Sequence, residues 1–165
     1  MANLNKKKKK ICHPATEIIP NFWIGNYSQR LEMLNCDILV PLDYLDGTIW
    51  ELGFKGEILY YPIPDYGVLP TDIAIKLAKT IIDKITYDQS VGMFCTGGHG
   101  RTGYITAIVL GMMGFNDPIK YLRTNYCRRA IETNEQIAHI AEILNSPQLK
   151  KYKGIIPSME WLNIN

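Results

Sequence analysis

Short apolar runs of strand length alternate along the chain with longer segments of helical periodicity. Strand-length runs occur at Glu17–Gly25, Cys36–Leu42, Glu57–Ile63 and Ser90–Phe94. The first run is interrupted by a Pro-Asn turn and therefore predicts a hairpin or a pair of edge strands.

Apolar residues spaced three or four apart predict the helices. A helix is expected to open at Thr71 and Asp72, after the proline-rich loop between Pro62 and Pro70. The segment Gly103–Met113 is apolar on nearly every face, which predicts a central helix. The remaining predicted helices are Ser28–Leu34, Asp117–Tyr126 and Thr133–Leu144, while Asp43–Gly56 is rich in turn residues and is expected to be irregular. Strands that alternate with helices predict the α/β class.

Composition restricts the class of protein but does not indicate a function. The chain has 165 residues and a net charge of +2, which suits one globular domain and gives no reason to expect a nucleic-acid partner. Lys6–Lys10 is expected to be a solvated tail. No apolar run reaches the roughly 18 residues that a membrane span needs. The four cysteines are scattered, which favours reduced thiols over a disulfide framework, so a cytoplasmic location is expected.

The candidate chemistry lies where the Ser90–Phe94 run meets the following helix. Four glycines within seven residues allow the backbone between Cys95 and Gly103 to curl with its N–H groups inward. Such a turn at a helix N-terminus binds an anion. The inward amides, the helix dipole and the Arg101 guanidinium all favour the thiolate of Cys95, and Arg101 can hold two phosphate oxygens.

Three other interpretations compete for this turn. A Walker-type phosphate loop requires a lysine that is missing here. The residues from Gly98 to Gly103 match the GxGxxG dinucleotide pattern, but the chain continues into another helix where that fold needs a strand ending in an acid. Cys95 as an ordinary buried thiol would leave the glycines and Arg101 without a purpose.

The segment Cys95–Gly103 resembles the Cys-x5-Arg-Thr phosphate-binding loop of the protein tyrosine phosphatase superfamily, in its compact dual-specificity branch. Three other segments match in order: Ile19–Asn26 resembles the first strand, Ile63–Pro70 the mobile acid loop, and Arg128–Gln136 the glutamine loop. The resemblance implies a single phosphatase-like α/β domain with a central mixed sheet of about four to five strands. The expected organisation is a basic flexible tail at residues 1–13, a dual-specificity-phosphatase-like catalytic domain at 14–146, and a C-terminal extension with Trp161 at 147–165 that packs on the domain.

The resemblance also implies roles for particular residues. Cys95 would attack phosphorus and form a cysteinyl-phosphate, and Asp65 would protonate the leaving oxygen and later accept a proton from water. Thr102 would hydrogen-bond the sulfur, and Gln136 would position water. Neither a metal nor another cofactor is required. The phosphate would be held by the Arg101 side chain and by the loop amides of Thr96, Gly97, Gly98, His99, Gly100 and Arg101.

The sequence departs from the family pattern at three positions. Phe94 replaces the histidine that usually precedes the nucleophile, so a polar contact expected to tune the cysteine is missing. His99 lies inside the loop, where it either adds a titratable group or points away, and the second is favoured. Glu132 stands where tyrosine-specific members tend to have glutamine.

A phosphorylated protein is the expected partner, with phosphotyrosine and also phosphoserine or phosphothreonine as possible substrates. The loop carries no lysine, which argues against a polyanionic inositol lipid. An RNA 5′-triphosphatase and a non-catalytic phosphate-binding module remain open alternatives. Oligomeric state is not indicated by the sequence.

Overall fold

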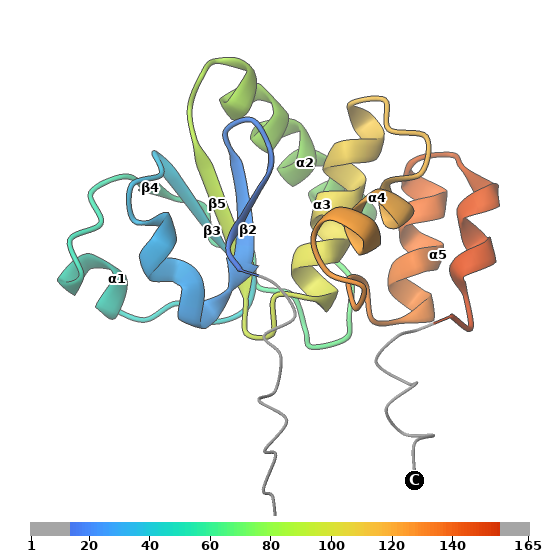
Figure 1. Cartoon of the computed structure of the whole chain (residues 1–165), viewed down its shortest axis with the longest axis horizontal. Coiled ribbons are helices and arrows are strands. Elements are labelled where there is room, and N and C mark those ends of the chain that lie inside the picture. The colour runs from blue at the N-terminus through green and yellow to red at the C-terminus, as the bar shows by residue number, and fades with distance from the viewer. Residues whose placement is uncertain (1–13, 156–165) are drawn as a thin grey trace, which may run out of the picture.

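The computed structural model describes residues 14–155, and these form an α/β domain around one mixed sheet (Figure 1). Five strands lie in the order β1-β2-β5-β3-β4, with β1 antiparallel to β2 and the other neighbours parallel. The strands are β1 (Thr16–Ile19), β2 (Phe22–Asn26), β3 (Ile38–Pro41), β4 (Glu57–Ile58) and β5 (Val91–Cys95). The expected hairpin, the α/β class and the mixed sheet of four to five strands are therefore confirmed.

Helical elements cover both faces of the sheet. The 3-10 helix η1 (Tyr27–Met33) and the short helix α1 (Thr48–Glu51) lie on one side, and the larger helices lie on the other (Figure 1). The larger helices are α2 (Thr71–Thr86), α3 (Gly100–Met112), α4 (Pro118–Asn125) and α5 (Asn134–Ile143). Sequence reasoning missed α1 inside the segment expected to be irregular, because a single helical turn gives no periodicity to detect.

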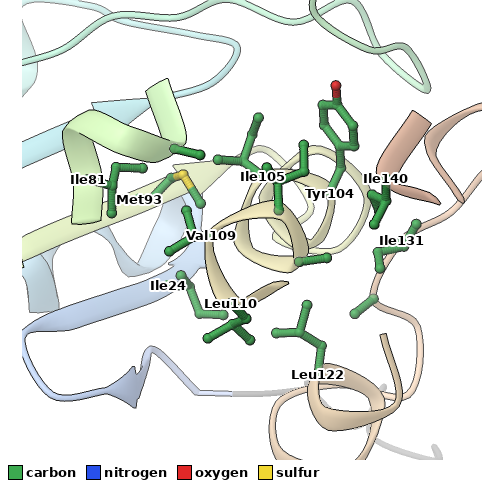
Figure 2. Packing of buried hydrophobic residues seen from close by; sticks show 14 of the residues in the cluster. Ile24, Ile81, Met93, Tyr104, Ile105, Val109, Leu110, Leu122, Ile131 and Ile140 are labelled. Atoms are coloured by element: carbon green, nitrogen blue, oxygen red, sulfur yellow. The ribbon is translucent and has the colours of Figure 1, made fainter. Parts of the chain in front are cut away.

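The central helix α3 fills the larger core, as its sequence predicted. Its residues from Thr102 to Leu110 are all buried. Figure 2 shows Val109 and Ile105 beside Met93 of the sheet, while Leu110 lies near Leu122 of α4. Because a packed interior resists displacement, this helix holds its own N-terminus firmly at the edge of the sheet.

The strand expected at Glu57–Ile63 is shorter in the structure but keeps its course. Regular pairing ends at Ile58, and the chain then continues alongside β3 through three further backbone hydrogen bonds, from Leu59, Tyr61 and Ile63. Pro62 and Pro64 lack N–H donors, which limits the ladder. These bonds still carry the chain to the carboxyl end of the sheet, where the acid loop begins.

The described part of the C-terminal extension packs on the domain. It forms the 3-10 helix η2 (Pro147–Tyr152), in which Leu149 is buried and the Tyr152 hydroxyl donates to Asp117 at 2.6 Å. Trp161 and the lysine run lie outside the described residues. Within residues 14–155, no helix combines the length and hydrophobicity needed to cross a bilayer.

The cysteines differ in state. Cys36 and Cys95 are free thiols, whereas Cys127 is disulfide-bonded. The expectation of reduced thiols is therefore wrong for Cys127, because scattered spacing along the sequence does not reveal which cysteines meet in the fold. Cys12 lies outside the described residues.

Candidate active site

The candidate site lies at the carboxyl end of the parallel strands. β5 ends at Cys95, which is paired in register with Asn26 at the end of β2, and Asp43 follows shortly after β3. Ligand sites in α/β sheets commonly form at this edge, because loops from several strands meet there. The dinucleotide interpretation fails here, since the helix α4 follows α3 and no further strand completes that fold within the described residues.

Cys95 lines a cavity of about 580 Å³. Only 2% of the residue is exposed, and its Sγ accepts hydrogen bonds from the Gly98 N–H at 3.2 Å and from the Thr102 hydroxyl at 3.1 Å. Both donors stabilise negative charge on sulfur. The structure thus brings together the cysteine and the threonine that the sequence singled out.

The loop around Cys95 depends on glycine at residue 98. Gly98 has φ +71°, and a Cβ added there would lie 2.9 Å from backbone atoms of Gly25 and Asn26. The Gly98 carbonyl accepts a 2.7 Å hydrogen bond from the hydroxyl of buried Tyr126. The loop is therefore fixed on one side by β2 and on the other by the Tyr126 side chain.

Arg101 lies between two carboxylates. Its Nη2 lies 3.1 Å from Asp43 Oδ2 and 3.4 Å from Asp65 Oδ1, and its Nη1 donates to the Ile63 carbonyl at 3.2 Å. The side chains of Arg101 and Asp43 are only 11% and 8% exposed, whereas that of Asp65 is 65% exposed. Asp43 thus forms the buried support for the guanidinium, and Asp65 faces the solvent side.

Sequence reasoning did not select Asp43. Besides Arg101, its Oδ2 accepts the Thr96 N–H at 2.5 Å and also the Thr96 hydroxyl. The Thr96 amide, expected among the phosphate donors, points to this carboxylate in the structure, although Thr96 still lines the cavity. An acid directly after a buried strand is a signal that could have found Asp43, because strand ends meet at this edge.

The expected acid loop carries Asp65 to the cavity wall. A turn is closed by the Gly67 N–H, which donates to the Pro64 carbonyl at 2.8 Å, and Tyr66 within it has φ +61°. Positive φ is costly for a tyrosine and requires outside support. The Thr133 hydroxyl supplies part of it by donating to the Tyr66 carbonyl at 3.2 Å.

Gln136 does not reach the cavity. It is fully buried at the start of α5, where its Nε2 donates to the Gly67 carbonyl at 3.1 Å and its Oε1 accepts the Glu132 N–H at 3.0 Å. The cavity wall on this side is instead formed by Arg129 and Glu132. Burial raises the pKa of the Glu132 carboxyl, and the Asp65 charge raises it further, while Arg129 and Arg101 oppose the shift.

The two unusual residues of the loop have different surroundings. Phe94 is buried against the smaller core on the η1 side of the sheet, with its ring 6.3 Å from that of Tyr27, so it faces away from Cys95. His99 lines the cavity, and its Nδ1 lies 3.4 Å from Cys127 Sγ. Gly97 and Gly100 line the cavity with it.

Comparison with known sequences identifies two relatives of this chain. No family model matches the chain. Two uncharacterized proteins of Methanocaldococcus jannaschii are 43% and 42% identical to it over 100 residues, which is 58% of this chain. The chain spans 65% and 60% of the lengths of these relatives, less than two thirds of either.

Solved structures share the fold at low sequence identity. Tk-PTP in its active form matches with a TM-score of 0.63 and 23% identity, covering 75% of this chain and 90% of that one. DUSP15 matches with a TM-score of 0.68 and 14% identity over 84% of this chain and 94% of its own. Human DUSP28 matches with a TM-score of 0.61 and 12% identity over 82% and 95%. The described domain therefore shares the fold of these phosphatases.

Proposed function

We propose that this protein is a cysteine-dependent phosphomonoesterase that acts on phosphotyrosine, and secondarily on phosphoserine or phosphothreonine, in protein substrates of the cytoplasm. One observation carries the proposal: Cys95 lines the cavity together with Arg101, and its sulfur accepts two hydrogen bonds. A buried sulfur with only a packing role needs neither the donors nor the guanidinium.

The first step of the proposed reaction uses the cavity residues directly. Cys95 Sγ bonds to phosphorus as the bond to the leaving oxygen breaks, and Asp65 gives that oxygen its proton. Arg101 and the amides of the loop hold the phosphoryl oxygens as charge shifts. The Thr102 hydroxyl stabilises the sulfur through its hydrogen bond. Gln136 does not contact the substrate and instead holds the acid loop in place through its hydrogen bond to the Gly67 carbonyl.

The cavity supports a protein monoester more than a polyanion. Its wall contains the cations Arg101 and Arg129 together with the acids Asp65 and Glu132, so additional phosphates would meet like charge. Because Cys95 is almost fully buried, a long aryl phosphate reaches it more readily than a short alkyl phosphate. Tyr66 lines the same cavity and is 57% exposed, which offers an aromatic surface to such a ring.

A panel of substrates tests this proposal. Phosphotyrosine peptide, phosphothreonine peptide, inositol phospholipid and RNA 5′-triphosphate should be offered to the wild type and to Cys95→Ser. We expect the fastest release of phosphate from phosphotyrosine peptide, and none above background from Cys95→Ser. Equal turnover by both proteins would refute the enzyme, and preference for a polyanion would refute the substrate class. Binding of vanadate without turnover of any substrate would leave a non-catalytic phosphate-binding module.

A further inference from the structure

A histidine that the proposed reaction does not use lies where the acid loop ends. The half-buried ring of His139 on α5 has its Nδ1 2.5 Å from the Tyr104 hydroxyl of α3 and its Nε2 2.9 Å from Thr71 Oγ1. The rings of His139 and Tyr104 are nearly parallel, with 5.7 Å between their centroids. Thr71 begins α2 directly after the loop. His139 therefore joins three helices at the exit of the acid loop.

Tyr104 extends this contact into the loop itself. Its side chain is fully buried, and Figure 2 shows it reaching out from α3 with the hydroxyl beyond the apolar residues around it. Burial raises the pKa of this hydroxyl, and a hydrogen bond to the Leu69 backbone opposes the rise. A bond that lowers the pKa of a phenol donates to its oxygen, so the Leu69 N–H is the donor. Leu69 is itself buried and lies near the end of the acid loop.

These contacts assign one form to the imidazole ring. A tyrosine hydroxyl has a single proton, and because its oxygen accepts from Leu69, that proton is donated to His139 Nδ1. The proton of the ring is then on Nε2, which donates to Thr71 Oγ1. A second proton, on Nδ1, would face the hydroxyl proton and leave one of the two donors unsatisfied. The network is therefore complete only with the neutral ring.

The other contacts that hold the acid loop do not titrate. At its entry the Ile63 N–H donates to the Leu42 carbonyl at 2.7 Å. In its middle it is held by the Thr133 hydroxyl and the Gln136 amide. Protonation of His139 therefore weakens the exit of the loop and leaves the remaining contacts in place.

Opposing influences act on the His139 ring. Burial lowers the pKa of His139, while the charges of Glu142 and Glu135 on the same helix raise it, and the net shift is downward. From α3 the facing titratable group is Tyr104, and from α2 the contact is the uncharged Thr71. Within the part of the chain that the structure describes, no charged side chain of α2 or η2 shifts this pKa.

Resting on the function proposed above, we infer that His139 is a positioning residue for the acid loop and makes the position of that loop depend on pH. The neutral ring holds Leu69, through Tyr104, and Thr71 at the exit of the loop, which keeps Asp65 at the cavity wall. Protonation of the ring breaks the contact with the Tyr104 hydroxyl and lets the exit move. Asp65 then protonates the leaving oxygen less efficiently.

Turnover of phosphotyrosine peptide by His139→Ala between about pH 5 and pH 8 tests this inference. The variant loses both contacts, so its kcat at about pH 7.5 should be roughly tenfold below that of the wild type, because a displaced catalytic group loses much of its effect. The deficit should shrink as pH falls below the ordinary histidine pKa of about 6.5, since the wild-type ring is then protonated as well.

His139→Asn separates the two forms of the ring. Its side-chain oxygen can accept from the Tyr104 hydroxyl in place of Nδ1, and it does not become protonated. At about pH 7.5 its kcat should be no more than about threefold below that of the wild type, as expected for one lost hydrogen bond. At about pH 5 its kcat should exceed that of the wild type. Lys79→Ala, at an exposed residue of α2, is the matched control and should follow the wild type at every pH.

Two further measurements distinguish positioning from general damage. Vanadate affinity should change by less than about threefold in both histidine variants, because the Cys95 loop keeps its contacts. Hydrogen exchange of Ile63–Pro70 at about pH 7.5 should be faster in His139→Ala than in the wild type. This second measurement requires no turnover.

A deficit of His139→Ala that is constant across the pH range overturns the inference, because a merely structural histidine would give that result. Equal hydrogen exchange, or loss of vanadate affinity in step with kcat, overturns it as well. If His139→Ala does not fold, His139→Asn decides: kcat above the wild type at about pH 5 supports the inference, and kcat below it at every pH contradicts the inference. Wild-type protein without Cys95-dependent turnover would refute the proposed function itself, which is a separate result visible in Cys95→Ser.

Discussion

The amide of Gln136 donates to the Gly67 carbonyl at 3.1 Å, and this single contact joins the start of α5 to the acid loop. The other end of the same amide binds the Glu132 N–H at 3.0 Å. One buried side chain therefore connects the segment that carries Asp65 with the segment that carries Glu132. A displacement of either segment therefore acts on the other through the Gln136 side chain.

Removing this link should impair catalysis more than binding. Gln136→Ala loses two hydrogen bonds, each worth about 1 kcal/mol net, and leaves buried backbone groups unsatisfied. The acid loop, with Tyr66 at positive φ, should then relax away from the cavity. We expect kcat for phosphotyrosine peptide to fall roughly tenfold, since small displacements of catalytic groups are costly. Vanadate affinity should change by less than about threefold.

Gln148→Ala provides the control for that variant, because Gln148 is exposed on η2. Its kcat and melting temperature should equal those of the wild type. If Gln136→Ala loses vanadate binding and kcat in equal measure, the side chain supports the phosphate loop itself rather than the acid loop.

Two neighbouring glycines should respond in opposite ways to alanine. At Gly98 a Cβ meets backbone of β2 at 2.9 Å and φ is +71°, so Gly98→Ala should lower the melting temperature and abolish vanadate binding. At Gly97 the nearest atom to an added Cβ is His99 Cδ2 at 3.5 Å, an ordinary contact. Gly97→Ala should therefore keep the wild-type melting temperature. Calorimetry of both variants checks this, and equal destabilisation would contradict the described loop.

Asp43 should be required for the action of Arg101. Its carboxylate holds the guanidinium at 3.1 Å and also binds Thr96. Loss of a charge-assisted bond costs about 1.5–3 kcal/mol, so kcat/KM for Asp43→Ala should fall roughly ten- to a hundredfold. Asp83→Asn, on the exposed face of α2, is the control. Higher kcat/KM in Asp43→Ala would mean that the carboxylate competes with the substrate phosphate for these donors.

Low pH should remove the stability that the ionised Asp37 carboxylate contributes at the end of the sheet opposite to the cavity. The Ser90 backbone N–H and hydroxyl donate to Asp37 and lower the pKa of its carboxyl. A folded-state pKa below the unfolded value of about 3.9 stabilises the protein above that pH, and the contribution is lost as pH falls through the folded pKa.

Asp37→Asn should therefore melt below the wild type at neutral pH, and the difference should shrink at about pH 2. Thermal unfolding across pH measures this, with exposed Asp88→Asn as the control. A difference between Asp37→Asn and wild type that stays constant down to that pH would show that the ionised carboxylate is not the stabilising form.

Local signals were strong enough to predict most of the fold and the centre of the site. The continuous apolar run of α3, the Asp117-Pro118 start of α4 and the glycines around Cys95 each act within a few residues, so they are visible in the sequence. The cap is seen directly in the structure, where Asp117 Oδ1 accepts the Lys120 N–H at 3.0 Å.

The remaining parts of the site depend on contacts between distant segments. Asp43 meets Thr96 across 53 positions, and Gln136 meets Gly67 across 69, so neither partner can be read from spacing. The sequence marks Glu132 only as a departure from a family pattern. Its direction into the cavity follows from the positive φ of Ile131, which no sequence preference reveals for isoleucine.

If Cys95 is the nucleophile of a phosphatase, its sulfur should carry the phosphoryl group during turnover. Wild-type protein should be mixed with excess phosphotyrosine peptide, quenched in acid within the first turnovers, and digested for mass spectrometry. We expect phosphate on the peptide that contains Cys95, and neither that adduct nor phosphate release in Cys95→Ser. Phosphate release by Cys95→Ser at the wild-type rate would contradict it.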